Sequence, residues 1–291
     1  MGFSGKTMEV FIDQDGREFG IEDIVETLKK VGADDCEHLF LHSDIVFGRI
    51  PKGMKRKEYL GALYESLKEL GVKSLIVPTF SYSFCNGEDY DVKESKSYIG
   101  ALNEYIRVNG EGRYRSLDPL LSVSVNEELK PLFDHPGDHS LGEGCALDTI
   151  HHMDGVKFLF FGIHMRQCFT HLHYIEKMLD VPYRFDISFE GNVTDHDGNV
   201  SRKTQSIHTQ LKGVKLLNYE GFEDRLIADG LMKEERLGDR TVACITEKDV
   251  YREMVDAITR DPNFFLEEPF DPSVATKEYT FGVDGSRITH C

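Results

Sequence analysis

The sequence predicts an α/β protein in which helices flank a central mixed sheet, with an antiparallel β-rich insertion at about residues 184–220. Two observations support this fold class. Helical and strand-like segments alternate through residues 21–180, as in chains whose helices cover a sheet. From about residue 183, β-type residues alternate with Asp-Gly and Gly-Asn turns, the sign of an antiparallel excursion. Without an internal repeat or a low-complexity linker, we expect one domain over residues 1–291.

The first half of the chain predicts three helices and two strands. The first helix is indicated by apolar residues at helical spacing, and the others end at Gly71 and Gly110. The strands are the apolar run "HLFLHSDIVFG", which breaks into a polar turn, and "VKSLIVPTF", which stops near Pro78. The helices are expected at residues 21–31, 58–71 and 99–110, and the strands within 38–48 and 72–80.

The second half predicts a short helix, a buried strand and a longer helix before the insertion. Thr170 can cap the longer helix, and Pro182 ends it. Two further helical segments follow the insertion. The short helix is expected at 146–153, the strand at 156–163, the longer helix at 171–180, and the late helical segments at 221–238 and 248–266.

Charge and apolar runs exclude several classes of partner. The net charge is −17 and no block of lysine or arginine is present, which argues against nucleic acid. Runs such as "SLIVPTF" are too short to cross a bilayer, and no signal peptide precedes them. The six cysteines have no paired short spacing, which favours a reducing compartment. We therefore expect a cytoplasmic protein that binds no membrane; whether it is a monomer or a homodimer stays open.

One short motif is misleading. "RVNGEG" at residues 107–112 fits the R-x-x-G-x-G loop that binds pyrophosphate in GNAT acetyltransferases. That loop requires a strand before it and a helix after it, so that backbone N–H groups face the phosphates. Here a predicted helix precedes it, and Asp118 and Pro119 disfavour an immediate helix after it. We interpret the motif as a helix that ends on Gly110.

Two segments carry candidate chemistry. The strand in "LHSDIVFG" ends at Ser43 and Asp44, at the sheet edge where open α/β sheets bind ligands. The same residues would also be found in an ordinary cap at the start of a helix. On the helix at 171–180, His171 and His173 lie about 200° apart, so they cannot hold one metal ion together. His173 and Glu176 share a face, which suits a carboxylate that orients a basic imidazole, although surface pairs of this kind are common. No cluster has metal-ligand spacing, and we expect no metal.

Several segments in one order resemble the aminoglycoside 3-N-acetyltransferase family, a fold distinct from GNAT. They extend over roughly residues 20–265, and their shared order is more specific than any one of them. The segments are "LHSDIVFG", "GVKSLIVPTFSYSF", "IGALNEYIR", "RYRSLDPLLSVSV", "LGEGCALDTIHHMDGVKFLFFGI", "FTHLHYIE", "VPYR" and "LIADGLMKEERLGDRTVACI".

The resemblance implies an enzyme that transfers acetyl from acetyl-CoA to the amine of an amino sugar. It implies His173 as the general base and Glu176 as the carboxylate near the amine. It also implies a cofactor site formed by the strand-end loop, where Asp44 replaces the family's second serine, and by the segment that lines the cofactor cleft. These cofactor residues are His42, Ser43, Asp44, Arg115, Ser116 and Ser122.

Departures from the family pattern bear on the acceptor. Where the family commonly reads R-S-x-H-P-T-H-S-V, this chain reads "RSLDPLLSV", with Asp118 and Leu121 in place of both histidines. The loop before Thr170 reads "GIHMRQCF". Because both changes are expected beside the acceptor and cofactor cleft, we expect a sugar-nucleotide or polysaccharide precursor as the acceptor.

Several alternatives stay open. The protein could be an aminoglycoside antibiotic 3-N-acetyltransferase that confers resistance, or a CoA- and sugar-binding homologue that has lost catalysis. It could also use another acyl donor or a hydroxyl acceptor. Cys168 lies near His173 in the sequence, which leaves an acyl-cysteine route as a rival to direct transfer.

Overall fold

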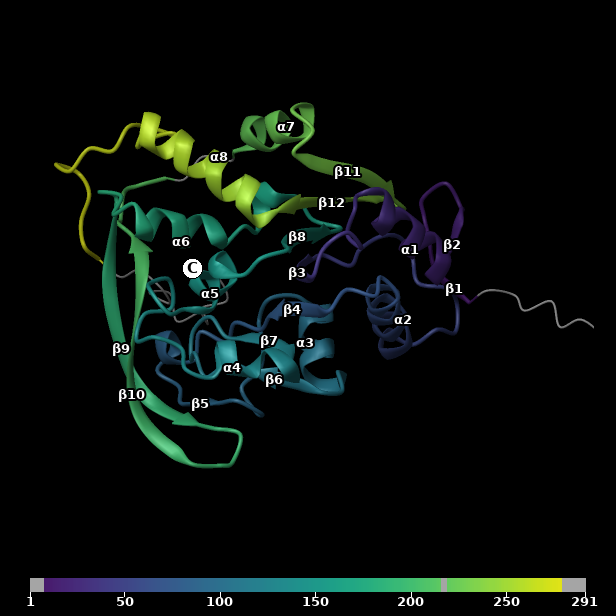
Figure 1. Ribbon diagram of the computed structural model, residues 1–291, viewed down its shortest axis with the longest axis horizontal. Coiled ribbons are helices and arrows are strands. Elements are labelled where there is room, and N and C mark those ends of the chain that lie inside the picture. Colours follow the sequence, from purple (N-terminus) through teal and green to yellow (C-terminus); the bar gives the residue numbers. More distant parts are fainter. Residues whose placement is uncertain (1–7, 216–218, 279–291) are drawn as a thin grey trace, which may run out of the picture.

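A mixed sheet forms the centre of the molecule, as predicted, and it has seven strands (Figure 1). The computed structural model describes residues 8–215 and 219–278. Strands β8, β3 and β4 are parallel neighbours, and every other neighbouring pair is antiparallel. The strands in spatial order are β11 (Met232–Leu237), β12 (Arg240–Thr246), β8 (Val156–Phe161), β3 (His38–Ser43), β4 (Ser74–Pro78), β7 (Val123–Asn126) and β6 (Arg113–Arg115).

Helices cover both faces of this sheet. One face packs against α1 (Ile21–Lys30), α2 (Arg56–Lys68) and α3 (Ala101–Asn109). The other face packs against α5 (Ala146–His152), α6 (His171–Met178), α7 (Glu220–Ala228) and α8 (Glu247–Arg260). Shorter helical turns are α4 (Lys130–Phe133), η1 (Phe84–Asn86), η2 (Glu127–Leu129) and η3 (Met165–Gln167). No helix of the described residues is long and apolar enough to cross a membrane.

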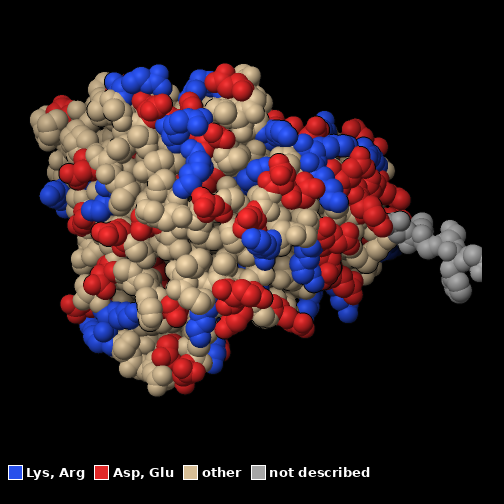
Figure 2. All heavy atoms as spheres, viewed as in Figure 1, with Lys and Arg blue, Asp and Glu red and all other residues tan. Residues whose placement is uncertain are grey.

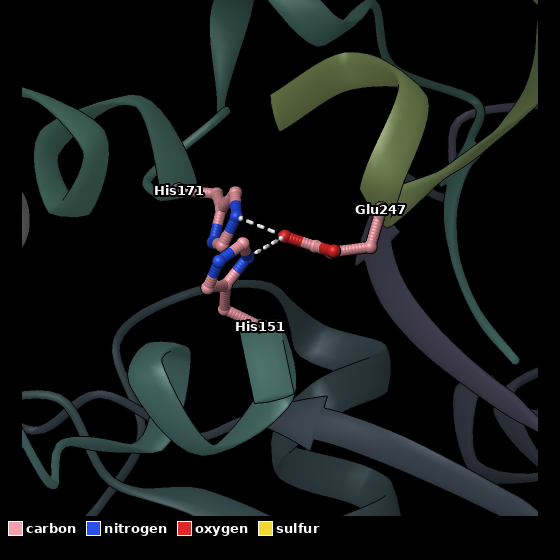
Figure 3. A group of neighbouring side chains, drawn as sticks. All are labelled: His151, His171 and Glu247. Atoms are coloured by element: carbon pink, nitrogen blue, oxygen red, sulfur yellow. Dashed lines mark hydrogen bonds and ion pairs between the residues drawn. The ribbon is translucent and has the colours of Figure 1, made fainter. Parts of the chain in front are cut away.

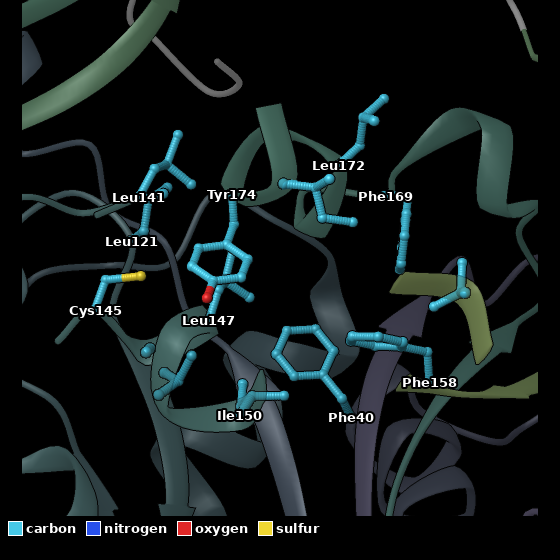
Figure 4. Close-up of a cluster of buried hydrophobic side chains, with 14 of the residues drawn as sticks. Phe40, Leu121, Leu141, Cys145, Leu147, Ile150, Phe158, Phe169, Leu172 and Tyr174 are labelled. Carbon is cyan, nitrogen blue, oxygen red and sulfur yellow. The ribbon is translucent and has the colours of Figure 1, made fainter. Parts of the chain in front are cut away.

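The two faces are made by alternate residues of the same strands, since side chains alternate along a strand. In β3, Leu39 and Leu41 are buried against the α1–α2 side, and Phe40 is buried against the α5–α6 side. In β8, Phe158 is likewise buried against the α5–α6 side, and Leu159 is buried against the α1–α2 side. Figure 4 shows Phe40 and Phe158 beside the buried side chains of α5 and α6. This packing fixes α6, the helix that carries His173, over the sheet.

The β-rich insertion is a long hairpin. β9 (Arg184–Thr194) pairs with β10 (Val200–Gln210) in an unbroken antiparallel register, and β5 (Tyr90–Asp91) adds a short parallel third strand. The hairpin curves along one side of the molecule (Figure 1). A second, unpredicted hairpin joins β1 (Glu9–Ile12) to β2 (Glu18–Gly20). The prediction of antiparallel pairing from residue 184 is confirmed over 184–210.

One predicted helix is wrong in its second half. The segment expected to be helical over 221–238 is a helix only to Ala228, and Met232–Leu237 form the edge strand β11. Gly230, at φ +73°, adopts a left-handed conformation that ends the helix. The charged residues of "MKEERL" favour helix, but an edge strand tolerates them because its outer face meets solvent. The rejected "RVNGEG" motif forms the last residues of α3 and the turn into β6, with the helix ending at Gly110 as expected.

Charges of both signs are interspersed on the molecular surface. Figure 2 shows acidic side chains gathered most densely at the end of the molecule that carries α1 and the β1–β2 hairpin. The middle of this face is largely uncharged. The net charge of −17 is therefore not concentrated there.

Candidate active site

A cavity of about 520 Å³ opens at the carboxyl ends of β3 and β4. This is the edge at which open α/β sheets bind ligands. His42 and Ser43 come from the end of β3, Pro78 from the end of β4, and Gly100 and Asn103 from the start of α3. The loop through η3 into α6 forms another wall, with Ile163, Arg166, Gln167, Cys168, Phe169, Thr170, Leu172 and His173; Phe80, Tyr82, Ile99 and Tyr219 complete the lining.

His173 and Glu176 form a pair in the first turns of α6, as their spacing predicts. His173 Nδ1 lies 3.0 Å from Glu176 Oε2. The glutamate is fully buried, whereas the imidazole side chain is 14% exposed and lines the cavity. Because Nδ1 is held by the protein, Nε2 is the ring nitrogen left for a ligand. Nδ1 can donate to Glu176, which leaves Nε2 free to accept a proton, or it can accept from Arg184 Nη2, which lies 2.6 Å away; a basic Nε2 requires the first tautomer.

Tyr183, which precedes β9, and Arg184, its first residue, complete this pair, and neither was assigned a role from the sequence. Arg184 Nε lies 2.7 Å from Glu176 Oε2, and Arg184 Nη2 lies 2.6 Å from His173 Nδ1. The Tyr183 hydroxyl donates to Glu176 Oε1 over 2.9 Å. The four side chains form one buried network, which fixes the imidazole relative to the cavity. No periodicity links α6 to β9, so only the folded chain brings them together.

The charges of this network are set by burial and by Arg184. Burial lowers the pKa of His173, and the adjacent Arg184 guanidinium lowers it further against the opposing effect of Glu176. Burial alone would raise the pKa of Glu176, but Arg184 and the hydrogen bonds from His173 and Tyr183 bring it down to about 2. At neutral pH the pair is therefore a neutral imidazole beside a carboxylate. That is the protonation state of a general base.

The opposite side of α6 carries a second histidine–glutamate cluster (Figure 3). His171 Nε2 lies 3.0 Å from Glu247 Oε1, and His151 Nδ1 lies 2.8 Å from the same oxygen. His171 and Glu247 are each 1% exposed. The prediction that His171 and His173 point to different sides of the helix is confirmed, since they meet different carboxylates.

Two groups of potential metal ligands occur among the described residues. One is His151, His171 and Glu247; the other is His164, Glu223 and Glu234. In the second group, Glu223 accepts from the backbone N–H of Met165 and from Arg166 Nη1, which lies 3.1 Å away. In the first, Lys248 Nζ lies 3.5 Å from Glu247 Oε2. A neighbouring cation disfavours a metal ion at either place. The absence of a metal requirement stays a prediction.

The predicted cofactor residues divide into two sets. His42 and Ser43 line the cavity, and the Ser43 hydroxyl donates to Asn103 Oδ1 over 2.8 Å. Asp44 is not among the described lining residues. Its carboxylate accepts from the backbone N–H of Val46 and lies 3.7 Å from Arg240 Nη2.

Arg115, Ser116 and Ser122, expected to line the cofactor cleft, do not line this cavity, and their role at the cofactor stays a prediction. All three are buried, none is among the described lining residues, and their polar atoms bind other protein groups. Arg115 Nη2 donates to the Thr79 carbonyl over 2.7 Å, and its Nε lies 3.1 Å from Ser122 Oγ. Ser116 Oγ accepts from the Val123 backbone. Burying a guanidinium requires such partners, so these residues support the strands behind the cavity.

The two replaced histidine positions also lie away from the cavity. Asp118 is 1% exposed and accepts from two backbone N–H groups and from Ser140 Oγ, which closes a buried turn. Leu121 is 2% exposed within the hydrophobic core. The expectation that these substitutions border the cleft is therefore wrong. The altered loop "GIHMRQCF" does border it, because most of its residues line the cavity.

His42 supplies an unpaired polar atom in the wall of the cavity. Its Nε2 is buried without a hydrogen-bond partner, and its ring stacks on Phe160 at 5.1 Å between centroids. Burial, followed by the effect of His171, lowers the pKa of His42 to about 3. The ring is therefore neutral, and a ligand group can satisfy the free nitrogen.

Other residues of the cavity carry little signal in the sequence. Tyr82 lies in the loop after β4 at φ +50°, a left-handed conformation that is rare for a tyrosine. Arg166 is the one arginine among the described lining residues, and no aspartate or glutamate is among them. Cys168 also lines the cavity, but burial, followed by the charge of Glu223, raises its pKa. A protonated thiol is a poor nucleophile.

Comparison with known proteins identifies the family. The family model described as aminoglycoside 3-N-acetyltransferase matches residues 41–259. An aminoglycoside N(3)-acetyltransferase III from Salmonella sp is 29% identical over 139 residues, which cover 46% of this chain and 48% of that protein. Another, from Enterobacter cloacae, is 30% identical over 110 residues, which cover 37% of each chain. The matched part thus spans less than half the length of these curated relatives.

Solved structures share the fold. The apoenzyme of aminoglycoside acetyltransferase AAC(3)-IVa superposes with a TM-score of 0.65 at 20% identity, over 91% of this chain and 95% of that one. Aminoglycoside acetyltransferase AAC(3)-IIb gives 0.67 at 19% identity, over 85% and 98%. The sheet, the covering helices and the sequence match over three-quarters of the chain agree. The chain belongs to the aminoglycoside 3-N-acetyltransferase family.

Proposed function

We propose that the protein transfers an acetyl group from acetyl-CoA to the amine of an amino sugar, with His173 as the general base. The observation that carries this proposal is the His173–Glu176 pair in the wall of the cavity at the carboxyl ends of β3 and β4. The family match supports the reaction class. A structural neighbour with a TM-score of 0.65 and 18% identity is described as AAC-IIIb binary with CoASH, which supports CoA as the co-substrate.

The reaction requires one proton to leave the amine. The amine nitrogen attacks the thioester carbonyl, the carbon–sulfur bond of acetyl-CoA breaks, and CoA leaves as a thiolate. His173 Nε2 accepts the amine proton, which then passes to the thiolate or to solvent. This step requires the tautomer in which Nδ1 donates to Glu176, whose carboxylate stays charged at neutral pH and stabilises the imidazolium that forms.

The network around the pair positions the base. Arg184 and Tyr183 hold Glu176 from two sides, so the carboxylate cannot turn away from His173. The tetrahedral oxyanion needs hydrogen-bond donors. His42 lines the cavity, and its buried, unpaired Nε2 is a donor when the neutral ring carries its proton there. We assign this role to His42 as part of the proposal.

The acceptor is the less defined substrate. The named relatives are aminoglycoside acetyltransferases, which supports an aminoglycoside better than the nucleotide-linked or polysaccharide amino sugar expected from the sequence. The cavity adds a constraint, because its described lining contains Arg166 and no carboxylate. An acceptor with several ammonium groups would have to place most of them outside this cavity.

Thiol release from acetyl-CoA tests the proposal. The purified protein is mixed with acetyl-CoA and a panel of aminoglycosides, mono-amino sugars and amino-sugar nucleotides, and acetylated products are identified by mass spectrometry. We expect amine-dependent thiol release with at least one amino sugar. Acetylation of a hydroxyl, or no thiol release with any member, would contradict the proposal and favour a different acceptor chemistry or a homologue without catalysis.

A further inference from the structure

A second network of charged and polar side chains lies beside the one that holds the proposed base, and it centres on Asp186. Asp186 follows Arg184 by two residues in β9, so the two side chains lie on the same face of the strand. Three groups reach the Asp186 carboxylate. Lys177 Nζ lies 2.5 Å from Oδ2, and His208 Nδ1 and His139 Nε2 lie 2.7 and 3.1 Å from Oδ1.

These partners come from three different segments. Lys177 lies on α6, His208 faces Asp186 across the β9–β10 register, and His139 lies in the loop before α5. The Asp186 carboxylate therefore ties a helix, a strand and a loop to one point of β9. Asp186 is not among the described residues that line the 520 Å³ cavity, so it can act on the reaction only through other residues.

The two networks are joined in two places. On α6, which lies beside β9 in Figure 1, Glu176 and Lys177 are consecutive. The first lies 2.7 Å from Arg184 Nε and the second 2.5 Å from Asp186 Oδ2, so each meets an opposite charge on β9. In β10, the His208 carbonyl accepts from Arg184 Nη1 over 3.3 Å, while the His208 ring reaches Asp186. A shift of β9 at Asp186 would therefore carry Arg184 away from its contacts.

The charge on Asp186 is fixed at neutral pH. Burial alone would raise the pKa of Asp186, but hydrogen bonds from Lys177, His208 and His139 bring it well below its usual range. Burial lowers the pKa of His208 to about 4, and it also lowers the pKa of His139. Asp186 is therefore a carboxylate held by one ammonium group and two neutral rings.

We infer that Asp186 is a positioning residue for the reaction: its carboxylate fixes β9 against α6, so that Arg184 stays on the His173–Glu176 pair. The inference rests on the proposed function, in which His173 is the general base. It adds a residue that touches neither the substrates nor the reacting atoms and acts through Arg184.

A double-mutant cycle between Asp186 and Arg184 tests the inference. Asp186→Asn should lower kcat about 10-fold, less than a full ångström of misplacement of a reacting group costs. The side chain is 44% exposed, so the variant should fold, and kcat is measured per folded molecule. If Asp186 acts through Arg184, the double variant should be no slower than Arg184→Gln alone. Losses that multiply would show independent roles and overturn the inference.

The pKa of His173 gives a second readout, which a purely structural role would not move. Removing the Asp186 charge acts directly to lower this pKa, because a nearby anion favours the imidazolium. Displacing Arg184 acts in the opposite direction, since its guanidinium lowers the pKa. We expect the displacement to dominate, because Arg184 Nη2 lies 2.6 Å from His173 Nδ1. The pKa should therefore rise in Asp186→Asn, as in Arg184→Gln, and stay close to the wild type in Asp186→Glu, which keeps the charge.

A matched control lies on the same hairpin. Glu190 on β9 pairs with Arg202 on β10 at 3.2 Å, and both side chains are exposed. Glu190→Gln removes the same charge from the same strand, and neither partner belongs to the two networks. Its kcat and its His173 pKa should match the wild type. An equal effect in Glu190→Gln would trace the changes to any charge loss on the hairpin and overturn the inference.

Failure of this inference and failure of the proposed function are distinguishable. NMR titration of the His173 ring, assigned with His173→Gln, measures the pKa without turnover. If the wild type acetylates an amine but the pKa in Asp186→Asn is unchanged or lower, the inference is wrong and the proposed function stands. If the wild type turns over no amine, the proposed function fails. The titration then decides alone whether Asp186 holds Arg184 on His173: a raised pKa supports it, and an unchanged or lower pKa overturns it.

Discussion

Two histidine–glutamate clusters lie on opposite sides of α6, and they differ first in their access to a cavity. His173 meets Glu176 on the side of the 520 Å³ cavity, where the imidazole is partly exposed. His171 meets Glu247 on the other side, where both residues are buried and His151 shares the same oxygen. A carboxylate orients a histidine in both clusters. Only one of the two histidines lines a cavity large enough for a substrate.

The comparison shows that the surroundings of a His–Glu pair, and not the pair alone, make its histidine a candidate base. At His171 the hydrogen bonds join α5, α6 and α8, so that cluster contributes to the packing of the helices. At His173 the cation Arg184 lies 2.7 Å from the glutamate and 2.6 Å from the imidazole, whereas in the other cluster the cation Lys248 lies 3.5 Å from Glu247. We therefore expect mutations on the two sides to affect different measurements.

The largest expected effect is on turnover at His173. His173→Gln should lower kcat by about 10²–10⁴-fold, the usual contribution of a general base. The thermal midpoint and the Kd for CoA should stay close to those of the wild type, because the side chain lies at the edge of the network. Steady-state kinetics with the best acceptor measure the change. His171→Gln is the control on the same helix, and an equal loss of kcat in both variants would contradict the assignment.

The next effect is on stability at Glu247. Glu247→Ala leaves His151 and His171 without their shared acceptor and should lower the free energy of unfolding by about 3 kcal/mol. The kcat of the protein that remains folded should change little. Denaturant unfolding measures the first quantity, and activity per folded molecule measures the second. A large loss of kcat without a loss of stability would make this cluster catalytic.

The pH dependence sharpens the comparison further. Burial and then Arg184 lower the pKa of His173, so its neutral form persists below pH 6.5, and its own protonation should reduce activity only under that value, by about 10-fold per pH unit. Arg184→Gln removes one cause of the shift, and the acid limb should move to higher pH. Titration of the acceptor amine affects both profiles equally. A limb that stays in place, or moves lower, would rule out His173 as the titrating base.

The smallest effect is expected at Cys168. Its thiol lines the cavity, yet burial and Glu223 keep it protonated, so it is a poor nucleophile at neutral pH. Cys168→Ala should leave kcat within about a factor of two of the wild type, since direct transfer needs no acyl-cysteine. Mass spectrometry after incubation with acetyl-CoA alone should detect no acetylated cysteine. A stable acetyl adduct on Cys168 would revive the covalent route.

Local patterns predicted the long helices, the strands β3, β4 and β8, the β9–β10 hairpin and the His173–Glu176 pair, because these depend on residues close in the sequence; they did not predict β6, β7 and β12. The i, i+3 spacing on one helix already places the imidazole beside the carboxylate. The strand β11 was missed since "MKEERL" has helical propensity, and only its pairing with β12 makes it a strand.

Contacts between distant segments were beyond local patterns. Arg184 reaches His173 from the first residue of β9, and Arg166 enters the cavity from a 3₁₀ turn. The family resemblance suggested Arg115, Ser116 and Ser122 as cofactor residues, but a motif does not show which way its side chains point. Burial and hydrogen bonding had to be seen in three dimensions before these residues could be separated from the cavity.

The most direct measurement of the central claim is a crystal structure of the protein with CoA bound. The account predicts the CoA sulfur in the cavity lined by His42, Ser43 and His173, with His173 Nε2 facing the space beside the thiol where an amine would attack. A sulfur atom placed outside that cavity, with His173 remote from it, would contradict the account.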